Sequence, residues 1–430
     1  MIRHLVFPVF ISFFILQLHA QTASDSAIIV YDIQIRGNST TSKDVILREM
    51  SLRIGDTLTQ QTKDLDRNNI YNLRLFNKVD IVDSVYQKQA TVIVTVSERW
   101  YFIPFPVFGM KYRDLSKLYY GAGIMHQNFR GRNEKLFALM YFGYDQLFMI
   151  NYQNPKVTDD DDIFVGTALT LQKLHNLSST AEEYMNSNLF LRGSIGKRFG
   201  MYQTLSSTFG YELWQVSNPQ LNNTISSSGR DAFLTLSLSY RFDTRDNNEY
   251  TTDGTLVSFT IAKNGFGESD VDIATANYDL RKFFGFNKGS AFNVRTAGSF
   301  AWGGTIPTYR HVFFGYDDRI RGYFYKILEA ENKISSSIEL RLPILLPRYL
   351  EIDWFQIPEF QKLRYGIYFC IFADAGKAWS RNQVLSEQPW YSGCGAGLQF
   401  LLPYGFTIRT EVAVNNVGDT EYIIDFDTSF

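Results

Sequence analysis

Cysteine, histidine and net charge are all scarce in this sequence. Its 430 residues include 2 cysteines and 5 histidines, and 42 basic against 44 acidic residues leave a formal charge of −2 at pH 7. His126, His175 and His311 lie beyond the first twenty residues, and no two of them have metal-binding spacing. There is no Gly-x-Ser-x-Gly segment and no phosphate-binding loop. The sequence therefore predicts no catalytic, metal or cofactor site, and its balanced charge does not indicate a nucleic-acid partner.

Long apolar runs are lacking beyond position 20. The segment 1–20 has Arg3 and His4 followed by an apolar stretch to Leu18, which is typical of a secretory signal peptide. An uncleaved anchor is the alternative, but the run is short for a membrane span. The rest of the chain is rich in Phe and Tyr, yet its mean hydropathy is only −0.16, because apolar residues occupy alternate positions. That pattern is typical of a membrane β-barrel.

Residues 27–98 read as a small α+β unit. The expected order is strand, helix, helix, strand, strand, with the first helix beginning near Thr41-x-x-Asp44 and the last strand carrying Val92, Val94 and Val96 on one face.

From Trp100 onward the sequence predicts a succession of strands. The candidates cover 100–110, 116–128, 134–144, 146–153, 163–174, 187–198, 202–216, 230–243, 254–264, 274–286, 290–302, 332–344, 364–378, 391–402, 405–416 and 420–430. This gives about 16 strands, an even number as bacterial barrels require, and their lengths suit the roughly 9–11 residues of a tilted membrane strand. Since backbone groups in a bilayer need internal partners, we expect residues 99–430 to close into a 16-stranded antiparallel barrel. The longest connection, about 303–331, is expected to be external.

Alternation is clearest near the carboxyl end. In the last strand one face carries Tyr422, Ile424, Phe426, Thr428 and Phe430, and the other carries the acidic residues and Ser429 together with Ile423. In strand 405–416 the lumen-facing residues are expected to be Thr407, Arg409, Glu411 and Ala413.

The two cysteines fall on opposite strand faces. Cys370 shares a face with Phe372 and Asp374, whereas Cys394 belongs to a face expected toward lipid. Opposite faces of one wall do not allow the short Cβ–Cβ distance of a disulfide. We therefore expect two free thiols, although an exported chain is otherwise able to pair its cysteines.

Several motifs resemble those of one family. In the barrel region they are Asn128-Phe129-Arg130-Gly131, Asp243-Thr244-Arg245-Asp246, Phe313-Phe314-Gly315, Arg321-Gly322-Tyr323, Glu339-Leu340-Arg341-Leu342-Pro343 and Phe372-Ala373-Asp374-Ala375-Gly376. In the amino-terminal unit they are Ile35-Arg36-Gly37-Asn38, Gly55-Asp56, Leu75-Phe76 and Glu98. The barrel motifs resemble the BamA/TamA outer-membrane assembly superfamily, and residues 27–98 resemble its polypeptide-transport-associated (POTRA) domain. A strand ending on Phe430 also resembles the sorting signal of bacterial outer-membrane barrels.

A loop-to-wall contact is the first candidate site. We expect Arg321 to fold into the lumen, where its planar group of donors suits the carboxylate of Asp374. Gly322 would allow a tight turn, Tyr323 would stack on Phe372, and Gly376 would leave room on the wall. The alternative is a solvated arginine in an ordinary external loop.

The barrel seam is the second candidate site. Pro104 and Pro106 lack N–H donors, and proline is excluded from well-paired central strands. Strand 100–110 would pair with the strand carrying Phe426 and Phe430, so this seam would be short of hydrogen bonds. The resemblance implies that client strands are admitted there by edge pairing. Alternatively, the prolines belong to a linker before a strand that starts later.

These expectations combine into one functional hypothesis. The resemblance implies a non-enzymatic factor that inserts or translocates polypeptides at the bacterial outer membrane, with its POTRA domain in the periplasm. Its expected partners are outer-membrane lipid, unfolded or extended client polypeptides, and periplasmic or lipoprotein subunits. The alternatives are a secretion pore dedicated to one partner protein and a passive porin or structural barrel.

Overall fold

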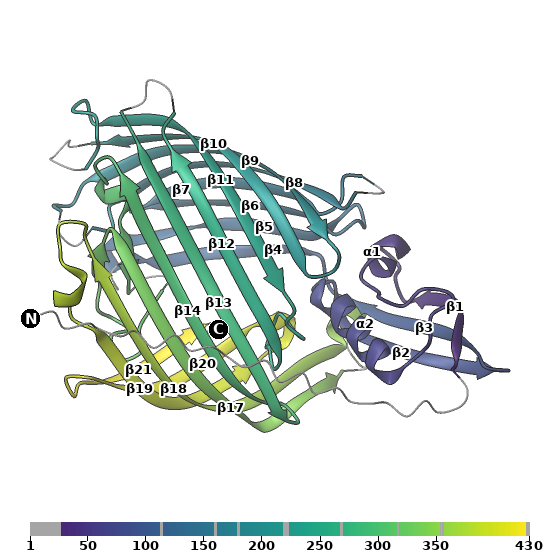
Figure 1. Ribbon diagram of the computed structural model, residues 1–430. Helices are drawn as coiled ribbons and strands as arrows, with labels where there is room; N and C mark the ends of the chain where they lie inside the picture. Colours follow the sequence, from purple (N-terminus) through teal and green to yellow (C-terminus); the bar gives the residue numbers. More distant parts are fainter. Residues whose placement is uncertain are drawn as a thin grey trace, which may run out of the picture.

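The structure is a computed structural model that describes residues 27–426 apart from 112–114, 159–160, 179–180, 218–222, 267–269, 316–317, 353 and 355–356. The expected signal peptide (1–20) and Phe430 lie outside the described residues. Figure 1 shows a large curved sheet and, beyond one end of its strands, a small α+β unit. No helix among the described residues is long and apolar enough to cross a membrane.

The amino-terminal unit contains β1 (Ile29–Arg36), α1 (Lys43–Leu47), α2 (Gln60–Asn72), β2 (Phe76–Tyr86) and β3 (Gln89–Glu98). Its sheet has the order β1-β3-β2, with β1 parallel and β2 antiparallel to β3. Val92, Val94 and Val96 point into its core, as their spacing predicts, and pack near Ile46 and Ile70 of the two helices. Thr59 caps α2 because its side chain accepts the Thr62 amide.

The large sheet has sixteen antiparallel strands, which confirms the predicted number and fold class. They are β4 (Phe102–Met110), β5 (Leu118–Phe129), β6 (Glu134–Gly143), β7 (Gln146–Asn154), β8 (Ile163–His175), β9 (Met185–Phe199), β10 (Gln203–Val216), β11 (Arg230–Asp243), β12 (Gly254–Asn264), β13 (Ile273–Asn287), β14 (Ser290–Gly303), β17 (Asn332–Glu351), β18 (Lys362–Trp379), β19 (Tyr391–Leu401), β20 (Thr407–Asn415) and β21 (Thr420–Phe426). A separate two-stranded ladder, β15 (Val312–Phe314) with β16 (Leu328–Ala330), lies in the long connection between β14 and β17.

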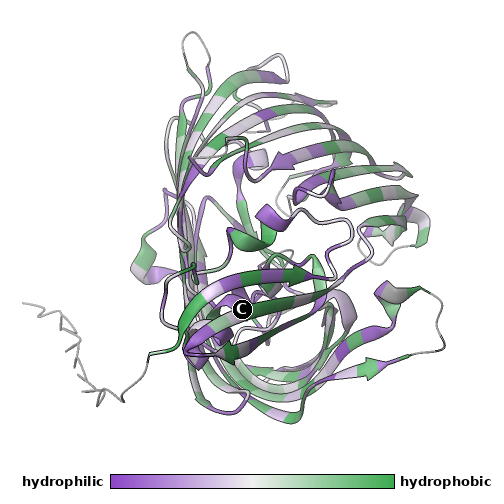
Figure 2. Cartoon of the chain, turned by 90° about the vertical axis from the view of Figure 1, so that its right-hand side faces the viewer, coloured by the Kyte–Doolittle hydropathy of each residue, from purple (hydrophilic) through white to green (hydrophobic). Residues whose placement is uncertain are grey.

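Hydrophobic and hydrophilic residues alternate along the strands of this sheet (Figure 2). Tyr422, Ile424 and Phe426 are exposed on the outer face of β21, whereas Ile423 between them is buried. Thr407, Arg409, Glu411 and Ala413 of β20 are buried on the inner face, as predicted. Cys370 is buried, Cys394 is exposed and both are free, which confirms that prediction.

The sheet ends at two edges, β4 and β21. No ladder joins them within residues 27–426 as the structure describes them, so the expected closure of the first strand onto the last is not seen. The chemistry of β4 is consistent with this, because its two prolines cannot donate across the junction.

The POTRA-like unit docks on the strand ends through a buried charged cluster. Arg99 donates to Glu249, in the β11–β12 turn, at 2.7 Å, and the Tyr71 hydroxyl of α2 donates to the same carboxylate at 2.8 Å. Burial alone would raise the pKa of Glu249, but Arg99, Tyr71 and Arg364 hold it below its usual range. Burial raises the pKa of Tyr71 to about 12, so this phenol remains a donor.

This cluster predicts a pH-dependent and mutation-sensitive docking. We expect Glu249→Gln to loosen the unit by up to about 3–5 kcal/mol, since Arg99 would keep a buried charge without a carboxylate. The lowered pKa means that the wild-type contribution is complete above the ordinary carboxyl value of about 4.3 and is lost as pH falls through the lower folded value. Spin-label distances between α2 and β12 would report both effects. Asp64→Asn, in an exposed pair on α2, should leave them unchanged, and equal behaviour of the two variants would contradict the prediction.

Candidate functional site

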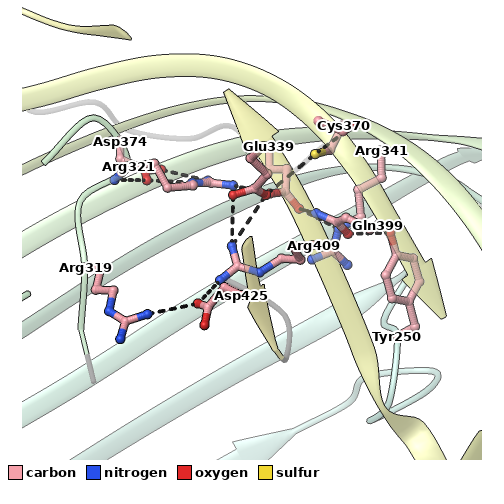
Figure 3. Close-up of polar contacts among 12 residues, drawn as sticks. Tyr250, Arg319, Arg321, Glu339, Arg341, Cys370, Asp374, Gln399, Arg409 and Asp425 are labelled. Atoms are coloured by element: carbon pink, nitrogen blue, oxygen red, sulfur yellow. Dashed lines mark hydrogen bonds and ion pairs between the residues drawn. The ribbon is translucent and has the colours of Figure 1, made fainter. Parts of the chain in front are cut away.

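The long connection between β14 and β17 begins at the strand ends opposite the POTRA-like unit and enters the space enclosed by the curved sheet. Its arginine, Arg321, is only 2% exposed. The Arg321 guanidinium donates to both carboxylate oxygens of Asp374, from Nε at 2.7 Å and from Nη2 at 2.8 Å (Figure 3). Its backbone amide also donates to Asp374 at 3.1 Å. The structure therefore brings the predicted arginine and carboxylate together in a two-pronged contact.

Arg321 also reaches two carboxylates that the sequence interpretation did not assign to the site. Its Nη1 donates to Glu339 of β17 at 2.7 Å and to Glu411 of β20 at 3.4 Å. The guanidinium carbon lies 3.6 Å from the centroid of the Phe372 ring, in cation–π contact. One loop side chain thus bonds to three different strands of the wall.

The surrounding network is electrically balanced. Each shared carboxylate has a second arginine, Arg341 on Glu339 at 2.6 Å and Arg409 on Glu411 at 3.2 Å. Arg409 and the loop residue Arg319 then share Asp425 of β21 (Figure 3). Four arginines therefore face four carboxylates, and the members are Arg319, Arg321, Arg341, Arg409, Glu339, Asp374, Glu411 and Asp425.

A metal ion fits this cluster poorly. Glu339, Cys370 and Glu411 have ligand atoms within 4.8 Å of one another and are all buried. Their carboxylates already accept from arginines, so a cation would meet guanidinium groups and no excess negative charge.

Two predicted glycines allow the loop to approach the wall. Gly322 has φ of +101°, and a Cβ there would lie 3.1 Å from the Cα of Gly393. A Cβ on Gly376 would lie 2.5 Å from Cδ1 of Ile320, which is 1% exposed. Gly393, which the sequence interpretation missed, leaves room for the Arg321 carbonyl.

The expected stacking of Tyr323 on Phe372 is wrong. Tyr323 instead packs edge-to-face with Tyr391, with ring centroids 5.0 Å apart, and its hydroxyl donates to Asn416 at 2.7 Å. Phe372 has Arg321 over its face and belongs to the same buried cluster as Phe324. The guanidinium occupies the ring face that Tyr323 was expected to cover.

The same loop holds the edge strand β21. The Phe324 amide donates to Glu421 at 2.8 Å, and the Tyr325 hydroxyl donates to the Tyr422 carbonyl at 3.0 Å. The loop therefore connects the buried charge network to the carboxyl-terminal edge of the sheet.

A second anchor ties the loop to a distant part of the wall. Tyr309 stacks on Trp214 of β10 with centroids 4.3 Å apart, and its hydroxyl donates to Asp231 of β11 at 2.7 Å. Arg310 donates to Glu212 at 2.7 Å. With one anchor on β10–β11 and the other on β17–β21, the connection crosses the interior of the curved sheet.

The prolines of β4 lie on the free edge. Alternate residues of an antiparallel strand direct their N–H and C=O groups to opposite neighbours. The Gln127 amide donates to the Tyr101 carbonyl at 3.0 Å, so the backbone N–H and C=O groups of odd-numbered residues in this segment point toward β5. Pro104 and Pro106 therefore occupy positions whose backbone faces away from β5, toward the edge.

The opposite edge follows the same rule. The Asn415 amide donates to the Asp419 carbonyl at 3.0 Å, so the backbone N–H and C=O groups of odd-numbered residues in β21 point toward β20. Phe426 and the other even-numbered residues of β21 therefore have backbone groups on the free edge, where Tyr325 occupies one carbonyl.

Sequence signals existed for the missed charged residues. Glu339 and Arg341 have the i, i+2 spacing that puts both on one strand face, within a motif already recognised. Arg409 and Glu411 were predicted to point inward. The contact of Glu339 and Glu411 with Arg321 depends on which strands meet across the curved sheet, and spacing does not contain that information.

Comparison with known proteins agrees with this architecture. The Omp85 superfamily domain matches residues 128–429, and the POTRA family described as surface antigen variable number repeat matches residues 28–99. Because the first match covers more than half of its length, the chain belongs to the Omp85 superfamily. It is an outer-membrane protein with its POTRA domain in the periplasm.

The sequence identity between this chain and individual relatives is low. The chain is 23% identical over 306 residues to outer membrane protein assembly factor BamA of Nitratidesulfovibrio vulgaris, covering 68% of this chain but only 37% of that protein. The structure of Haemophilus ducreyi BamA lacking POTRA domains 1–3 has a TM-score of 0.55 at 16% identity, covering 93% of this chain and 84% of that chain. CdiB from Escherichia coli has a TM-score of 0.58 at 9% identity, covering 92% and 74%. At these identities the two structures show a shared fold.

Proposed function

We propose that this chain inserts or translocates polypeptides at the outer membrane without catalysis, through its POTRA domain and the junction of β4 with β21. We call this junction the seam. The observation that carries the proposal is the state of the two edges. Among the described residues β4 and β21 form no ladder, and Pro104 and Pro106 remove donors from edge-facing positions. A strand with free carbonyls and few donors is a template for another chain.

The loop supports this reading over a passive pore. A porin needs an open water-filled lumen, whereas this loop crosses the interior and is fixed at Tyr309 and at Arg321. The BamA likeness and family membership favour a polypeptide as the transported species, and CdiB shares the same fold.

Site-specific crosslinking tests the proposal. A photo-crosslinking residue at Phe108 of β4 or Ile424 of β21 should trap outer-membrane polypeptides in cells, identified by mass spectrometry. The control position is Leu236 of β11, which is outward and exposed but far from either edge in the strand order. Client chains trapped equally at all three positions would contradict a role for the seam, and trapping from lumen positions alone would favour a secretion pore.

A further inference from the structure

A cavity of about 530 Å³ lies where the POTRA domain meets the strand ends of β6 to β11. One side is formed by α2, with Asn69, Asn72 and Leu73, and the other by the inner faces of the strands. The volume is in the range of sites that bind small molecules or short peptides. None of the contacts described for the loop or the seam involves this cavity.

One charge on its wall is unmatched. The cavity is lined by four basic and three acidic side chains, namely Arg48, Lys135, Arg198, Arg245, Glu49, Asp162 and Asp243. Glu49 pairs with both Arg48 and Arg198, Asp243 with Arg245, and Asp162 with Lys156. Within the part of the chain that the structure describes, Lys135 has no hydrogen-bond or ion-pair partner, so its ammonium group leaves the cavity positive.

Unpaired acceptors also line the cavity. Asn133 is only 7% exposed and lines the cavity, yet its Oδ1 has no donor, and the same holds for Oδ1 of Asn248. A buried amide oxygen without a donor is costly. Phosphate at neutral pH supplies few donors, whereas a peptide supplies N–H groups to amide oxygens and carbonyls to amide nitrogens.

The floor of the cavity has the dimensions of an extended segment. Lys135, Gln153, Gly166 and Ser194 are cross-strand partners in one row over β6, β7, β8 and β9, and all four line the cavity. Three strand spacings of about 4.8 Å give a trough of about 14 Å, which holds about four extended residues. The small residues Gly166 and Ser194 keep the trough open at the end away from Lys135.

We propose that this cavity binds a short extended polypeptide segment bearing a carboxylate. Lys135 binds the carboxylate, and Asn133 and Asn248 form hydrogen bonds with the peptide groups. The proposal rests on the function proposed above, since it places a client contact between the POTRA domain and the lumen.

Peptide binding to the purified full chain in detergent tests this site. The probe is a fluorescent six-residue extended peptide with one central Asp, compared with the same peptide carrying Asn. Lys135→Gln should weaken the acidic peptide roughly tenfold to a hundredfold, as expected for a charge-assisted hydrogen bond, and should leave the neutral peptide within about threefold. Gln153→Glu should act similarly, because it supplies Lys135 with an internal carboxylate across the strand pair. Lys173→Gln, at the outer end of β8, is the matched control and should change neither affinity.

Three results would overturn the proposal. They are equal affinity for the acidic and neutral peptides, unchanged binding in both cavity variants that remain folded, and displacement by inorganic phosphate as effective as by unlabelled acidic peptide. The binding assay does not depend on the seam, so it can fail while crosslinking at Phe108 succeeds.

Discussion

A covalent bond across the seam should abolish activity in cells while leaving the barrel folded. We would replace Cys370 and Cys394 by alanine, then pair Phe108→Cys in β4 with Tyr422→Cys or Ile424→Cys in β21. All three positions are outward and exposed, and their backbones face the two free edges. Because an added strand needs those edge groups, closing them should stop client assembly, and a reductant should restore it.

The control tether joins two strands that are already paired. Phe108 and Tyr120 are direct partners between β4 and β5, at a pair whose backbones do not bond to each other, so their side chains are close enough for a disulfide. This tether should leave assembly unchanged. Full client assembly by the oxidised β4–β21 protein would show that the seam does not open, and a lumenal route would then be the better explanation.

The sixteen strands could be predicted because alternation and turns are local features. β11 and β12 begin and end at the predicted residues, since polar turns flank clear outward apolar rows. β17 is the instructive exception, because it was expected over 332–344 and extends to Glu351. Pro343 and Pro347 interrupt the pattern, but the strand continues through register shifts around Leu345, and irregularities of this kind accommodate residues that cannot donate.

The candidate site was predictable only in part. Arg321 and Asp374 carry motifs, and strand parity put Asp374 on the inner face. Parity also put Arg409 and Glu411 inside, but it does not say which inward residues of different strands meet. The contact of Tyr309 with Trp214 crosses the interior between segments far apart in sequence. Such contacts depend on the curvature of the whole sheet and on the path of a loop, which no local pattern encodes.

Removing the guanidinium of Arg321 should destabilise the barrel more than removing the Asp374 carboxylate. Arg321→Ala would leave Asp374, Glu339 and Glu411 clustered and buried without their shared cation, at a cost of about 3–5 kcal/mol. Asp374→Ala leaves Arg321 with Glu339 and Glu411, so its cost should be smaller. Denaturant unfolding in detergent, with the heat-dependent gel shift of the folded barrel as a second readout, would measure both.

The double variant distinguishes a direct interaction between Arg321 and Asp374 from independent effects of the two substitutions on stability. If Arg321 and Asp374 interact directly, the loss in Arg321→Ala/Asp374→Ala should be smaller than the sum of the two single losses. Arg241→Ala is the matched control, because Arg241 is half-exposed on the wall and its partner Asp243 keeps Arg245, so the loss should stay below about 1 kcal/mol. Strictly additive losses would mean that the two residues stabilise the barrel independently.

Arg321→Lys adds a test of geometry at constant charge. An ammonium group is a compact donor and cannot span both oxygens of Asp374 while also bonding Glu339 and Glu411, as the planar guanidinium does. The lysine variant should therefore recover only part of the stability lost in Arg321→Ala. The same loop holds β21 through Phe324 and Tyr325. We therefore expect the crosslinking yield at Ile424 to differ from the wild-type yield slightly in Arg321→Lys and more strongly in Arg321→Ala. Full recovery by lysine would show that the site needs a positive charge but not a planar guanidinium. The two-pronged contact would then carry no special role.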